Sequence, residues 1–216
     1  MTGFTDELDE SLMNPVVMQF QRNIVERIFS ASLKFRSFWD KLRPLVSRAR
    51  QSERMLLTMY DARNVANEFL RQAKARNTTL TNMELQKLVY IAHGYSLAIL
   101  DRPLIKQHVE AWRYGPVIPD LYHALRQYRN GNVKEFINLF PQETLSETDS
   151  KLVESVLDAY GRFSGAQLST MTHREGTPWR EVYEPNASFH SDTIPDKLIR
   201  AHYRQLLNER AGIKAA

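Results

Sequence analysis

The 216-residue chain contains no cysteine, and this absence narrows the classes of protein to which it can belong. A chain without thiols has no disulfide scaffold and no zinc site built on cysteine ligands. It also has no apolar run near the ~18 residues that a membrane-spanning helix needs. The N-terminal residues Asp6, Glu7, Asp9 and Glu10 are acidic, whereas a secretory signal peptide begins with a basic region. These absences together predict a cytoplasmic protein without a membrane span.

The familiar sequence signatures of catalysis are also missing. The chain has no phosphate-binding glycine loop, no G-x-S-x-G turn, and no histidine pair with the spacing of a zinc helix. We therefore expect no cofactor, no metal and no enzymatic activity. One catalytic alternative stays open, in which Glu110, Asp120 and His173 converge in one cleft within hydrogen-bonding reach.

What the chain does have is the composition of an ordinary folded protein. Hydrophobic residues make up 43% and charged residues 25%, which is enough for one domain with a well-buried core. The 29 Lys and Arg residues are offset by 25 Asp and Glu residues. This mildly basic balance permits nucleic-acid binding but does not favour it.

Residues 1–58 form a predicted N-terminal extension. Apolar residues recur every three or four positions from Val17 to Leu45, which predicts a basic amphipathic helix over 15–46. Such a helix docks on the main domain, pairs with a second copy as a homodimer, or contacts a membrane surface or a partner protein. A different interpretation of residues 1–58 is that translation naturally starts at Met59.

Helix-capping signals organise the rest of the chain, and we predict one mainly α domain over 59–208 and a C-terminal tail over 209–216. Asp61 is a good N-cap, and Thr81 with Glu84 forms a capping box. The helix that follows to about Leu100 is apolar on most sides, so we expect it to be the central core helix. Later helices are predicted from Ser146, from Gly165, after Thr177-Pro178 and after Thr193 with Pro195.

A rigid corner lies between two of these helices, at residues 112–119. It contains two aromatic residues, a glycine and two prolines, a combination that cannot continue a helix. The runs Leu104–Ile105 and Val109–Tyr114 are β-prone, and we expect them to form a small hairpin beside the corner. The shape of such a corner is one that a partner protein could recognise. This favours a binding module.

A DNA-binding regulator is the main alternative class. Basic and aromatic residues gather around the helix that begins at Pro119. They are Arg113, Tyr122, His123, Arg126, Tyr128 and Arg129. Leu121 and Leu125 mark the inner face of this helix, so the arginines also fit an ordinary solvated outer face.

Several motifs in a fixed order resemble one known family, the Panacea domain, also called SocA-like or GepA-like. The first motif is LQKLVYIAHGY at 85–95, and Arg102-Pro103-Leu104 follows. The next is EAWRYGPV at 110–117, and the last are the segment 168–173 and Thr177-Pro178-Trp179. The resemblance covers about residues 60–207.

The resemblance implies an antitoxin of a bacterial or prophage toxin–antitoxin pair that binds its toxin directly. The toxin is expected to be encoded by a neighbouring gene, and a proteolysis adaptor role is a further implication. It implies no catalysis. Candidate partner-binding residues are Trp112, Arg113, Tyr114, Gly115, Pro116, Tyr122, Arg126, His173 and Trp179. Of these, Gly115-Pro116 also fits a purely structural turn, and both tryptophans also fit the core.

Overall fold

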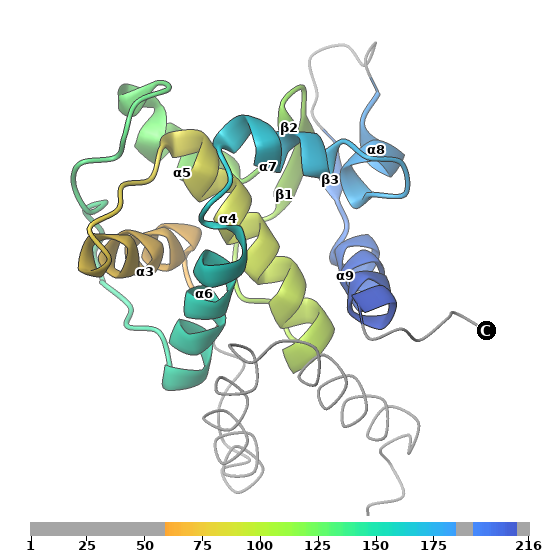
Figure 1. The fold of residues 1–216 in the computed structure, drawn as a ribbon, viewed down its shortest axis with the longest axis horizontal. Coiled ribbons are helices and arrows are strands. Elements are labelled where there is room, and N and C mark those ends of the chain that lie inside the picture. Colours follow the sequence, from red (N-terminus) through yellow and green to blue (C-terminus); the bar gives the residue numbers. More distant parts are fainter. Residues whose placement is uncertain (1–58, 185–191, 211–216) are drawn as a thin grey trace, which may run out of the picture. The chain divides into compact units, whose positions relative to one another are not determined.

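The computed structural model describes residues 59–184 and 192–210, which form a mainly helical fold with one small sheet (Figure 1). This confirms the predicted fold class for the described part of the chain. The predicted N-terminal helix over 15–46 lies outside these residues, as does most of the predicted tail over 209–216. None of the helices in the two described ranges combines the length and apolar character needed to cross a bilayer.

A buried tyrosine, Tyr60, lies two residues before helix α3 (Ala62–Ala75). Tyr60 forms a parallel bridge with Ile105, so the predicted pairing of Leu104–Ile105 with Val109–Tyr114 is wrong. The Tyr60 hydroxyl donates to Asp149 at 2.9 Å and accepts from the Ser146 backbone N–H at 3.0 Å. This residue therefore ties the start of the domain to two segments that are distant in sequence.

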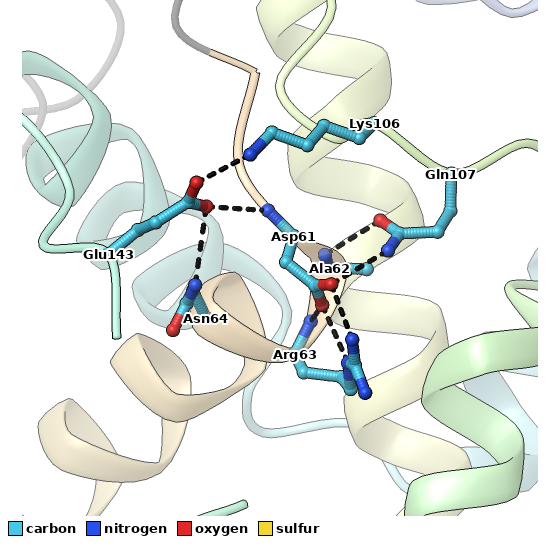
Figure 2. Close-up of polar contacts among 7 residues, drawn as sticks. All are labelled: Asp61, Ala62, Arg63, Asn64, Lys106, Gln107 and Glu143. Carbon is cyan, nitrogen blue, oxygen red and sulfur yellow. Dashed lines mark hydrogen bonds and ion pairs between the residues drawn. The ribbon is translucent and has the colours of Figure 1, made fainter. Parts of the chain in front are cut away.

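Polar side chains close the first turn of α3, as Figure 2 shows. Asp61 is the predicted N-cap, and its backbone N–H donates to Glu143 at 3.0 Å. Glu143 also pairs with Lys106. The Gln107 side chain accepts from the Ala62 N–H at 2.9 Å and donates to Asp61 at 3.0 Å. The exposed donors of the helix end are thus bound by residues from two other segments.

Helix α4 (Asn82–Tyr95) is the central helix, as predicted, and nearly all of its residues are buried. The predicted capping box is present, because Thr81 accepts from the Glu84 N–H while Glu84 accepts from the Thr81 N–H. The helix continues as the π-helix η2 (Ser96–Leu100) and stops at Asp101, which has a left-handed backbone. In Figure 1, α4 passes through the middle of the described elements, and contacts join it to α3, α6 and α7.

The sheet has three antiparallel strands in the order β2-β1-β3: β1 (Val109–Trp112), β2 (Gly115–Val117) and β3 (Thr193–Ile194). The hairpin joins β1 to β2 through two tip residues, because a glycine directly after the tip allows the chain to reverse at once. That local reversal explains why Leu104–Ile105 is not the partner of β1. Thr193 lies in β3, and the expectation that it caps the last helix was wrong.

Helix α5 (Pro119–Leu125) begins at its proline, as predicted, and ends in the 3-10 turn η3 (Arg126–Tyr128). Helix α6 (Glu147–Tyr160) has the predicted N-cap, since the side chain of Ser146 accepts from the Asp149 N–H. Between these two elements the chain runs alongside α3, where the Asn67 amide binds both the N–H and the C=O of Ile137. The segment exposes Phe140 completely.

Two short helices and one longer helix complete the described chain. Helix α7 (Gly165–Thr172) and helix α8 (Pro178–Val182) pack close to the sheet, and α8 has the predicted cap at Thr177. Helix α9 (Asp196–Arg210) follows β3. It packs on α4 at Gly94, where an added Cβ would lie 2.2 Å from the ring of Tyr203. The glycine therefore allows a close approach of the two helices.

Candidate functional site: the braced hairpin

The candidate site is the β1–β2 hairpin, with Arg113 and Tyr114 at its tip. Both tip residues are exposed, and 62% of Tyr114 is accessible to solvent. The Arg113 guanidinium lies 5.6 Å from the centre of the Tyr114 ring, within the range of a cation–π contact. Gly115 follows with a φ of +103°, a conformation that side chains with a Cβ rarely adopt.

The backbone of the tip is held by side chains from α7, α8 and the turn between them. The Trp112 carbonyl accepts from the Trp179 indole at 2.7 Å, and the Tyr114 carbonyl accepts from the Ser169 hydroxyl at 2.9 Å. The Arg113 carbonyl lies 3.3 Å from Nε2 of His173. Side chains from other elements of the fold therefore contact three successive carbonyls of the hairpin, and the Arg113 and Tyr114 side chains remain exposed.

Trp112 and Trp179 take different positions. Trp179 is buried, lies against His173 with ring centres 3.8 Å apart, and stacks on Tyr183. Trp112 is half-buried on the outer side of β1 and makes an edge-to-face contact with Tyr122, with ring centres 4.9 Å apart. Trp179 thus serves mainly as a brace, whereas Trp112 forms part of the surface.

A carboxylate fixes the orientation of Trp112. The Trp112 indole N–H donates to Glu110 at 2.7 Å, and the other oxygen of Glu110 lies 2.8 Å from Nε2 of His108. Glu110 and Trp112 are two residues apart on β1, so their side chains share one face, and His108 directly precedes the strand. The outer face of the hairpin is consequently ordered before any partner arrives.

Comparison with known proteins places this arrangement in a family. The model of the family described as Antitoxin SocA-like, Panacea domain, matches residues 85–180. Antitoxin SocA of Caulobacter vibrioides (strain NA1000 / CB15N) is 35% identical over 155 residues, which cover 67% of this chain and 82% of the relative. The chain belongs to the SocA-like, Panacea domain family. No solved structure matches it. The match to the Panacea model spans most of α4, the hairpin and the residues of α7 and α8 that hold it.

Most of the candidate partner-binding residues of this Panacea domain lie together. Trp112 to Pro116 form the hairpin, His173 and Trp179 hold it, and Tyr122 packs against it. Arg126 is exposed on η3, and no hydrogen bond, ion pair or ring contact described for it joins its side chain to the hairpin. The geometry therefore gathers eight of the nine residues at or beside the hairpin.

The catalytic alternative required Glu110, Asp120 and His173 to meet, and they do not form such a cluster. Glu110 binds His108 and Trp112, while His173 faces the backbone oxygens of Arg113 and Ser169. Asp120 is exposed on α5. None of the hydrogen bonds described for these three residues joins one of them to another. Within residues 59–184 and 192–210, no group of three or more His, Asp and Glu side chains could hold a metal ion.

His93 has a carboxylate beside its ring, as many catalytic histidines do, but its geometry does not suit catalysis. Its ring is 1% exposed, and Nδ1 accepts from the Leu104 N–H at 3.3 Å. Nε2 lies 3.1 Å from Asp196, and this hydrogen bond holds the pKa of Asp196 below its usual value. Both ring nitrogens are therefore used to join α4 to the start of α9 and to the segment after Pro103.

The residue that sequence reasoning missed is Lys87, which lies on α4 beneath the hairpin. It is 1% exposed, and its Nζ donates to the Pro116 carbonyl at 2.8 Å. Burial lowers the pKa of Lys87 to about 7, because the charged form loses its contact with water. The sequence offers a sign of this burial, because Lys87 lies inside a helix that is apolar on most sides. A lysine in such a helix is either buried with it or interrupts its apolar pattern.

Proposed function

We propose that the protein is an antitoxin that neutralises a toxin by direct protein–protein binding, and that the braced hairpin is the contact surface. Membership of the SocA-like, Panacea domain family and the name of the Caulobacter relative support the antitoxin role. The structural support is the tip itself. Its backbone carbonyls are bound internally, whereas Arg113 and Tyr114 point outward.

The chemistry of the tip suits protein recognition. Tyrosine, tryptophan and arginine are the side chains that contribute most often to protein–protein binding energy. Here Trp112, Arg113, Tyr114 and Tyr122 are gathered on one ordered element. Because three side chains donate hydrogen bonds to carbonyls of the hairpin and His173 lies 3.3 Å from a fourth, little conformational entropy is lost when a partner binds.

Co-expression with the adjacent open reading frame tests this proposal. We expect the adjacent product to stop growth when it is expressed alone, and the full-length protein to restore growth. Tyr114→Ser should abolish the rescue and weaken binding of the two purified proteins by ~30-fold, corresponding to about 2 kcal/mol for the loss of an aromatic anchor.

Phe140→Ser is the matched control, because Phe140 is fully exposed but lies on the segment between η3 and α6. It should leave rescue and affinity unchanged. An adjacent product that is harmless when expressed alone would contradict the antitoxin role. If Tyr114→Ser rescues growth as well as the wild type does, the contact surface lies elsewhere.

A further inference from the structure

A lysine with no carboxylate partner among the described residues is buried beneath the contact surface proposed above. The only hydrogen bond described for the Lys87 amine goes to the Pro116 carbonyl, at 2.8 Å. A Cβ at Gly115 would lie 2.9 Å from the same amine and 2.7 Å from the Thr172 hydroxyl. Lys87 on α4, Thr172 on α7 and the first residues of β2 therefore meet in one tightly packed place.

The two elements that meet at this amine, β2 and α7, offer it no compensating charge. Strand β2 (Gly115–Val117) and helix α7 (Gly165–Thr172) both pack on α4, and neither carries an ionisable side chain. The nearest ionisable groups along these segments are Arg113 and Tyr114 at the exposed tip and His173 after α7. On α4 itself they are Glu84 and the buried Tyr90. Within the described residues, no ion pair includes Lys87.

We propose that Lys87 is a positioning residue whose buried amine determines whether the hairpin presents Arg113 and Tyr114 to the toxin. The proposal rests on the proposed function, because it assigns a control to the same surface. As a neutral amine, Lys87 donates to Pro116 and remains in its apolar surroundings. As an ammonium ion it has three donors and a charge to solvate, and the buried site supplies one carbonyl. Protonation therefore favours a loosened hairpin base that admits water.

The expected size of the effect follows from the population of the neutral form. Because burial brings the pKa of Lys87 to about 7, its charge changes within the physiological range. About nine-tenths of the molecules carry the neutral amine at pH 8 and about one-tenth at pH 6. If only the neutral form binds, the apparent Kd rises ~10-fold between these two values, because affinity falls in proportion to the competent fraction.

Binding of the full-length protein to the product of the adjacent open reading frame, measured by calorimetry from pH 6 to pH 8 at constant ionic strength, tests this. The wild type should bind ~10-fold more weakly at pH 6 than at pH 8. Lys87→Met should remove that difference, since its side chain cannot be charged. Lys87→Gln keeps a neutral donor for Pro116 and should bind at every pH as the wild type does at pH 8.

His173 is the competing source of a pH effect, because its ring nitrogens face the carbonyls of Ser169 and Arg113. His173→Gln should therefore keep the ~10-fold difference, whatever its absolute affinity. The proposal is overturned if the wild-type profile is flat, if either lysine variant keeps the wild-type profile, or if His173→Gln alone abolishes it. If Lys87 had only a structural role, its substitution would change thermal stability and leave the pH profile of binding unaltered.

A second measurement separates this inference from the proposed function. The indole N–H signals of Trp112 and Trp179 report on the hairpin, since one indole lies on it and the other donates to it. In the free wild-type protein these signals should shift with a midpoint near pH 7, and the shift should be absent in Lys87→Met. If the adjacent product does not bind at all, the proposed function fails, and this titration alone decides the role of Lys87. No midpoint in the wild type, or the same midpoint in the variant, overturns it.

Discussion

Two regions of the molecule use similar polar residues in opposite ways. At the start of α3, the side chains of Asp61, Lys106, Gln107 and Glu143 bind one another and the helix end, so that their hydrogen-bonding groups are spent within the fold (Figure 2). At the hairpin, side chains from other elements bind the backbone, and the tip side chains are left exposed. The first arrangement closes a domain, and the second displays a surface.

The comparison predicts that changes to the hairpin backbone have the largest effects. Gly115→Ala should lower the free energy of unfolding by about 3 kcal/mol or more and abolish toxin binding. The new Cβ meets Thr172 and Lys87 at less than 3 Å, and the φ of +103° adds backbone strain. Chemical denaturation and calorimetry measure the two effects.

Gly176→Ala is the matched control for this variant. Gly176 also has a positive φ, of +74°, but nothing lies within 4 Å of an added Cβ. Its cost should be about 1–2 kcal/mol, which is the backbone strain alone. Equal losses in the two variants would show that the packing under the hairpin is not tight.

At the start of α3, a substitution with a large effect on stability should leave toxin binding unchanged. Tyr60→Phe removes the hydroxyl that donates to the fully buried Asp149 and accepts from the Ser146 N–H. We expect the free energy of unfolding to fall by about 2 kcal/mol, because buried polar groups lose a partner. Affinity for the toxin should be unchanged under conditions in which the variant is folded.

The control is Tyr114→Phe, which removes a hydroxyl from an exposed ring. It should change stability by less than about 0.5 kcal/mol. If Tyr60→Phe weakens toxin binding while the fold is intact, the two regions are coupled and the separation drawn above is wrong.

The parts of this fold that the sequence predicts are those set by residues within one helical turn of each other. The caps at Asp61, Thr81, Ser146 and Thr177 all act within one helical turn, and each is present. Pro119 at the start of α5 follows the same rule, because its fixed φ suits the first turn of a helix.

Long-range partners were not predictable in this way. The side chains that hold the tip are Ser169, His173 and Trp179, which follow it by 55 to 67 residues. Nothing in a local pattern says that a histidine will face one particular carbonyl. Strand β3 was missed for the same reason, since its two residues become a strand only by pairing with β1. Burial of Lys87 likewise depends on where β2 and α7 pack.

The smallest expected effect concerns how the stability of the polar cluster at the start of α3 changes in acid. The Lys106 ammonium holds the pKa of Glu143 below its ordinary value, and the Asp61 N–H acts in the same direction. A depressed pKa in the folded state stabilises the fold above the ordinary glutamate value of about 4.3, and this contribution is lost as the pH falls below it. Glu143→Gln should therefore reduce stability by less than about 1 kcal/mol at pH 7, because the pair is largely solvated.

The difference between Glu143→Gln and the wild type should shrink as the pH falls, because the wild-type carboxyl becomes protonated. Thermal denaturation at pH 7 and at pH 3 measures it, with the exposed Glu135→Gln as the control for removing one negative charge. Toxin binding at pH 7 should be unaffected by either variant, because neither residue touches the hairpin or the side chains described as holding it. A loss of binding in Glu143→Gln alone would mean that the polar cluster at α3 contributes to toxin binding as well as to closing the domain.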